Sequence, residues 1–173
     1  MINRIEALLS PLTRFMHLIS CVVLVAMMMV TLADVVTRSL FEMTTGSLDL
    51  TFPGGVELIK YGLLITVFFC LPHSVERSQV HVDLFTNRMS ERAKGAMQGI
   101  YLLGYVFLGT AMSYEFYISA QDAVMSEETT QDLLIPVSYF YDVTAFASGV
   151  LAVAALVSAL RLISGGKMVE RVE

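Results

Sequence analysis

The chain has 173 residues, of which 55% are hydrophobic and only 16% are charged, and its formal net charge is −5. A soluble domain usually has about 25% charged residues, and a nucleic-acid partner would need a basic patch, so the composition argues against both classes. The charges are also segregated between four long apolar windows. This pattern predicts an all-α membrane protein with four transmembrane helices in a single membrane domain over residues 1–173.

The first apolar window predicts a span over residues 15–35. Its uncharged part, Phe15 to Ala33, is 19 residues long, which suits a membrane helix and exceeds the apolar core of a cleavable signal peptide. We therefore expect an uncleaved helix after a short cytoplasmic lead, in which Pro11 weakens helical continuity. Asp34 and Arg38 follow at i and i+4, close enough to pair on one helix face.

A loop is predicted over residues 39–55, because it contains Gly46, Pro53 and two further glycines. The second span is predicted over residues 56–75 and opens with Glu57 and Lys60 on one helix face. Ionisable groups at this depth are tolerable when they are paired. We therefore predict a polar cluster at the outer ends of the first two spans, with a structural or subunit-interface role, formed by Asp34, Arg38, Glu57 and Lys60.

The connection from His73 to Gly95 holds four basic residues, more than any other connection. From Asp83 onward, apolar residues such as Leu84, Phe85 and Met89 fall near one helix face. This pattern predicts an interfacial amphipathic helix between the second and third spans.

The third span is predicted over residues 95–115 and contains Gly95 and Gly99 at a helix-packing spacing. Residues 115–132 carry acidic side chains without Lys or Arg. They lack the pattern of a calcium loop and are expected to form a solvated acidic connection. The fourth span is predicted over residues 138–161.

The basic residues give the orientation. Nine of the eleven Lys and Arg residues fall on one side if both termini share that side. Lys and Arg accumulate in cytoplasmic loops, so both termini are predicted to be cytoplasmic.

Several short motifs occur in order along these spans: Asp34-x-x-x-Arg38, Glu57 at the start of the second span, Gln79-Val80-His81-Val82-Asp83 after it, and Ile135-Pro136 followed by Tyr141. With them the chain resembles the small membrane subunit of a TRAP (tripartite ATP-independent periplasmic) transporter. Asp83 matches the family pattern, whereas Gln79 stands where the family often has His. The resemblance covers nearly the whole chain.

The resemblance implies a non-enzymatic scaffold in a bacterial inner membrane for a large membrane subunit. That large subunit takes up a small organic anion delivered by a periplasmic solute-binding protein. Sodium and substrate sites are then expected on the large subunit, with no cofactor, metal, catalytic or substrate site in this chain. Asp83 joins the four charged residues above as a candidate structural or interface residue. The remaining partners are membrane lipids.

Two alternatives follow from other features. One is a membrane anchor of a quinone-linked or haem-containing enzyme complex, with His17, His73 and His81 as candidate axial ligands. The other is a self-sufficient channel or exporter, which the uncharged span centres disfavour. Cys21 and Cys70 match no metal spacing and are expected to be small buried residues.

Overall fold

The computed structural model describes residues 2–44, 53–77 and 91–163. These residues form four helices, α1 (Ile2–Met43), α2 (Gly55–Arg77), α4 (Glu91–Met125) and α5 (Ser138–Ile163). The predicted all-α class is confirmed.

Three of the helices contain segments long and apolar enough to cross a membrane, namely Ala7–Met43, Gly55–Val75 and Ser138–Leu160. They correspond to the predicted first, second and fourth spans. Among the described residues, α4 does not meet the same measure of length and apolar composition. The third span therefore stays a prediction.

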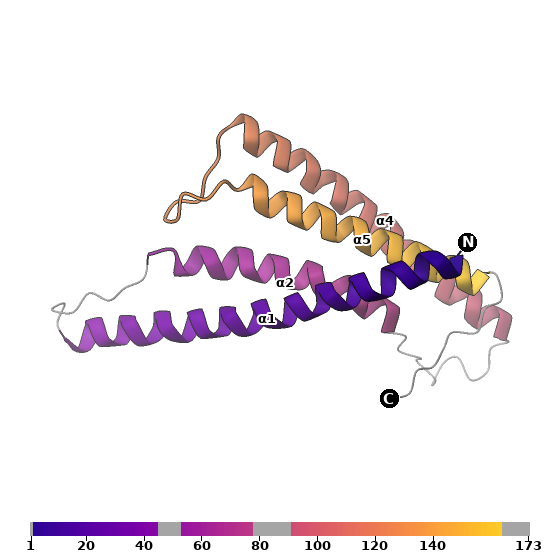
Figure 1. Cartoon of the computed structure of the whole chain (residues 1–173), viewed down its shortest axis with the longest axis horizontal. Coiled ribbons are helices and arrows are strands. Elements are labelled where there is room, and N and C mark those ends of the chain that lie inside the picture. The colour runs from indigo at the N-terminus through magenta and orange to yellow at the C-terminus, as the bar shows by residue number, and fades with distance from the viewer. Residues whose placement is uncertain (1, 45–52, 78–90, 164–173) are drawn as a thin grey trace.

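The helices form two antiparallel hairpins, α1 with α2 and α4 with α5 (Figure 1). The most extensive contact is between α4 and α5, and packing of α2 on α5 joins the hairpins. Figure 1 shows the hairpins meeting near the start of α1 and the end of α5, and diverging toward the α4–α5 connection. Both described ends of the chain thus lie at one end of the molecule.

The helix α1 is longer and more continuous than the sequence indicated. Pro11 lies inside it without breaking it, because the neighbouring Thr13 and Met16 are almost fully buried and hold this turn against the core. At the other end the helix continues to Met43, so the loop expected from residue 39 was placed too early. The Ser39 hydroxyl donates to the Val35 carbonyl at 2.9 Å, so this polar side chain is satisfied within the helix.

The helix α4 also extends beyond its predicted end, to Met125. The acidic connection, which was expected to begin at residue 115, therefore begins only after Met125. Ala120 and Ala123 are at most 3% exposed, and their packing stabilises the extra turns of the helix. At its start, residues 91–94, which precede the predicted third span and were assigned to the interfacial helix, belong to α4. The rest of that prediction falls on residues 78–90, outside the described residues.

Two apolar clusters at the junction of the hairpins form the core. In the first cluster α2, α4 and α5 pack together, and its buried residues are Val75, Leu102, Leu151, Ala155 and Ala159. The other brings in α1 through Met16, Phe68, Ala147 and Val150. Burial of these side chains is the main stabilising interaction between the hairpins.

Small residues allow α4 and α5 to approach closely. A Cβ added at Gly109 would lie 2.9 Å from the backbone nitrogen of Ala152, so no larger residue fits without a shift. Nearby, the Ser113 hydroxyl donates to the Ala145 carbonyl at 2.9 Å. Gly104, on the same helix, has open space around it, so α5 approaches closely at Gly109 and not at Gly104. Interhelical packing of this kind is typical of membrane helices.

Candidate functional site

The site is built around Glu57, in the first turn of α2. Its carboxylate accepts backbone hydrogen bonds from three consecutive residues of the distant α4–α5 connection. The Gln131 and Asp132 amides donate to Oε1 at 2.5 and 3.0 Å, and the Leu133 amide donates to Oε2 at 3.2 Å. Consecutive N–H groups form a concave site that favours an anion. A carboxylate in the first turn also interacts favourably with the helix dipole.

The connection over residues 126–137 is shaped to present these amides. The helix α4 ends with Glu127 in the left-handed region at φ 51°, and the Glu128 amide donates back to the Ala123 carbonyl. This is the hydrogen-bond pattern of a Schellman helix end, with Glu127 where Gly is usual. Thr129 and Pro136 then form an antiparallel bridge that closes the turn.

Thr130 fixes the inside of this turn. Its amide donates to the Ile135 carbonyl at 2.9 Å, and its hydroxyl accepts from the Ile135 amide at 3.1 Å. Thr130 is 4% exposed, so these bonds lie away from solvent. The turn is therefore rigid on both sides of the three amides that bind Glu57.

Gly54, just before α2, gives the connection room to dock. Its φ is +87°, a conformation that favours glycine. A Cβ at this position would lie 2.6 Å from Cγ of Leu133. Gly54 thus provides the turn into α2 and the space for the Leu133 side chain, while Glu57 binds the Leu133 backbone.

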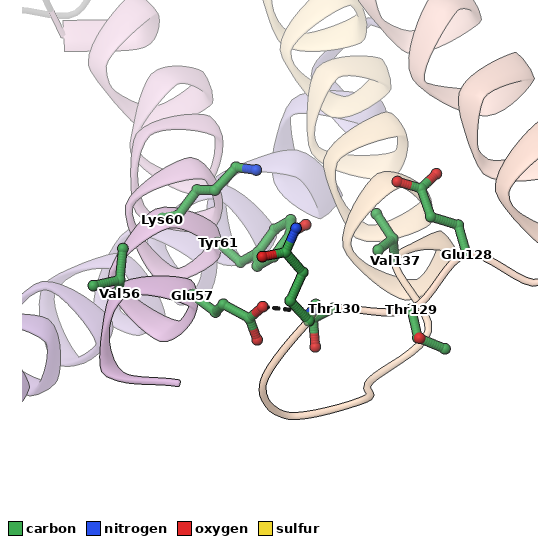
Figure 2. A pocket seen from close by; sticks show the side chains of 9 residues that line it. Val56, Glu57, Lys60, Tyr61, Glu128, Thr129, Thr130 and Val137 are labelled. Atoms are coloured by element: carbon green, nitrogen blue, oxygen red, sulfur yellow. Dashed lines mark hydrogen bonds between the residues drawn. The ribbon is translucent and has the colours of Figure 1, made fainter. Parts of the chain in front are cut away.

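A cavity of about 310 Å³ lies between the start of α2 and this connection. Figure 2 shows Glu57, Lys60 and Tyr61 on the α2 side, with Glu128 on the opposite side. The Lys60 ammonium lies 5.1 Å from the centroid of the Tyr61 ring, within range of a cation–π interaction. Tyr61 also stacks on Phe140 of α5, with ring centroids 4.2 Å apart.

Asp34 and Arg38 form the pair predicted from their spacing. Arg38 Nε lies 2.9 Å from Asp34 Oδ2, with side-chain exposures of 57% and 14%. The second oxygen, Asp34 Oδ1, is buried and has no hydrogen-bond partner within the described part of the chain.

The predicted cluster thus resolves into two arrangements. Asp34 pairs with Arg38 on α1, whereas Glu57 binds the α4–α5 connection. Within residues 2–44, 53–77 and 91–163, no ion pair links either of these acids to Lys60. The interface role of these residues stays a prediction, and Asp83 lies outside the described residues.

The histidines form a contact of a different kind. The rings of His17 and His73 stack with centroids 4.7 Å apart. Rings in direct contact leave no space for a porphyrin between them, so this arrangement does not favour the haem-anchor hypothesis; His81 lies outside the described residues. Cys70 Sγ lies 3.6 Å from His17 Nδ1. Cys21 is exposed rather than buried as expected, because it lies on the outward face of α1.

Sequence reasoning missed the binding partners of Glu57. Gln131, Asp132 and Leu133 contribute through backbone amides, which carry no residue-type signal. The Ile135-Pro136 motif does not by itself indicate a structural role. In the fold it closes the turn, because Pro136 pairs with Thr129 and Ile135 with Thr130.

These features define a class. Much of the α1 surface is apolar and exposed, as a helix facing lipid or a partner helix requires. Long apolar helices with charged groups gathered at their ends make this a multi-pass membrane protein. The family model described as tripartite ATP-independent periplasmic transporters, DctQ component, matches residues 27–165. The chain belongs to this family and is a TRAP transporter small membrane subunit.

The family assignment confirms the resemblance drawn from the sequence. It is a transporter-component family rather than an enzyme family, and it implies a complex with a large permease and a periplasmic binding protein. No curated protein and no solved structure matches the chain.

Proposed function

We propose that this chain scaffolds the large permease subunit during sodium-coupled uptake of a small organic anion, which a periplasmic binding protein delivers. In this proposal the large subunit binds sodium and substrate. The chain itself supplies a rigid helical support in the inner membrane, with both termini cytoplasmic and α4 as its third span.

One observation carries this proposal: among the described residues, Glu57 and the Asp34–Arg38 pair lie near helix ends and bind groups of this chain itself. Glu57, the best-bound carboxylate, uses both oxygens to hold the α4–α5 connection. The span centres, including residues 61–75 and 143–160, contain no Asp, Glu, Lys or Arg. Midplane transport sites normally require ionisable groups or broken helices. A supporting role fits this distribution better than a transporting one.

Co-expression tests the scaffold. The large permease subunit should be recovered in the membrane with this chain as a stable complex, and its yield should fall when the chain is omitted. A large subunit that accumulates, stays folded and transports at full rate without this chain would overturn the proposal.

Reporter fusions test the orientation separately. Fusions after residue 85 and at the carboxyl terminus should report a cytoplasmic location, and a fusion within residues 126–137 should report a periplasmic one. A periplasmic carboxyl terminus would contradict the orientation and leave the scaffold role to be judged by co-expression.

A further inference from the structure

The cavity beside Glu57 has a charge pattern that its own residues do not satisfy. The Glu57 carboxylate already accepts hydrogen bonds from the amides of Gln131, Asp132 and Leu133. Lys60 and Glu128 also line the cavity and are both exposed. Figure 2 shows Lys60 on α2 and Glu128 beside the start of α5.

These two charges do not neutralise each other. In the part of the chain that the structure describes, no ion pair joins Lys60 to Glu128 or to Glu57. The cavity, of about 310 Å³, is therefore lined by Lys60 and the amide-bound Glu57 carboxylate on the α2 side and by Glu128 on the other side. Its occupant should carry both charges in the opposite order, so that an anion meets Lys60 and a cation meets Glu128.

The cavity also has an apolar part and an interfacial position. Val56 and Val137 line it together with the Tyr61 ring. Two candidate membrane-spanning segments begin beside it, at Gly55 and Ser138. Tyr and Lys residues at the end of a membrane helix lie at the level of lipid headgroups. An occupant at this depth has a polar head at the charged walls and an apolar tail toward the hydrocarbon.

We propose that this cavity binds the headgroup of a zwitterionic phospholipid such as phosphatidylethanolamine. The phosphate contacts the Lys60 ammonium, and the lipid ammonium contacts the Glu128 carboxylate. The glycerol region lies against Val56 and Tyr61. The proposal requires that the chain lies in a bilayer and does not depend on which subunit transports the substrate.

Lipid titration of the full-length chain in detergent, followed by native mass spectrometry, tests the site. Didecanoyl phosphatidylethanolamine is compared with phosphatidylglycerol of the same chain length, which has the phosphate but no ammonium. The wild type should bind one phosphatidylethanolamine in preference to phosphatidylglycerol. One surface charge contributes about fivefold in lipid affinity, so Lys60→Gln should weaken both lipids by about that factor.

The Glu128 variant distinguishes the two lipids, because only phosphatidylethanolamine has an ammonium group. Glu128→Gln should weaken phosphatidylethanolamine by about fivefold and leave phosphatidylglycerol unchanged. Arg14→Gln and Glu127→Gln are matched controls, because both residues are exposed and neither lines the cavity. These controls should retain wild-type affinity for both lipids.

Three results would overturn the proposal. The first is equal wild-type affinity for the two lipids, which does not depend on any variant. The second is binding of soluble phosphoethanolamine as tightly as the lipid, which would assign the cavity to a free zwitterion. The third is displacement of the bound lipid when the large subunit is added, which would assign the cavity to that protein.

Discussion

Glu57 and Leu133 are 76 positions apart in the chain, and the Leu133 amide donates a 3.2 Å hydrogen bond to Glu57 Oε2. This bond, with those from the two preceding amides, joins the hairpin of α1 and α2 to the connection of the other hairpin. It does so at the end where Figure 1 shows the hairpins diverging. Glu57 therefore fixes the shape of the molecule where apolar packing is least extensive.

Removing the Glu57 carboxylate should loosen residues 126–137. Glu57→Ala leaves three amides without an acceptor, whereas Glu57→Gln retains one acceptor oxygen. Hydrogen exchange of peptides covering residues 131–133 should therefore be fastest in the Ala variant, intermediate in the Gln variant and slowest in the wild type. Glu115→Gln, an exposed change on α4, is the control. Equal exchange in all four proteins would show that the carboxylate does not hold the connection.

Gly54→Ala should loosen the same connection by a different route. The left-handed backbone costs a residue with a Cβ about 1–2 kcal/mol, and the new methyl group meets the Leu133 side chain. Adding Leu133→Ala should relieve the steric part and recover part of the lost thermal stability. If the double variant is no more stable than Gly54→Ala alone, contact with Leu133 is not the cause.

Gly109→Ala should destabilise the α4–α5 pair by about 1–3 kcal/mol, because its Cβ would press on backbone atoms of α5. The matched change Gly104→Ala, in open space on the same helix, should be neutral or stabilise by up to about 1 kcal/mol. Unfolding in detergent by denaturant measures both. Equal effects would contradict the close approach assigned to Gly109.

Asp34→Asn should reduce co-purification with the large subunit more than it reduces the stability of the isolated chain. The Asp34–Arg38 pair is half exposed on the Arg38 side, so its loss should cost the isolated chain under about 1 kcal/mol. In the complex, the exposed Arg38 guanidinium is expected to contact the large subunit, and its ion pair with Asp34 holds it in position. Glu42→Gln, exposed and further along α1, should leave assembly intact. Normal assembly with Asp34→Asn would remove this residue from the interface.

The helical class and three apolar spans were predictable because membrane helices leave long uncharged windows in a sequence. Helix ends were not. Pro11 suggested a weak point and the glycines after residue 45 suggested a loop from residue 39, yet α1 is continuous to Met43 and the buried Met16 anchors its first turns. Local propensity is overridden there by packing that involves residues far along the chain.

The site was predictable only in part. The spacing of Asp34 and Arg38 specifies their pairing, because both residues lie on one helix. Glu57 and Lys60 have the same kind of spacing but different partners. Glu57 binds backbone amides of a loop, and a backbone amide is present at every residue except proline. Only the folded arrangement of the two hairpins identifies which amides those are.

Transport by reconstituted liposomes tests the central claim most directly. Vesicles with this chain alone should show no sodium-driven uptake of an organic anion. Vesicles with this chain and the large subunit should take up the anion when the loaded binding protein and an inward sodium gradient are supplied. Clear uptake by the chain alone would contradict the scaffold assignment, because the substrate path would then lie within these helices.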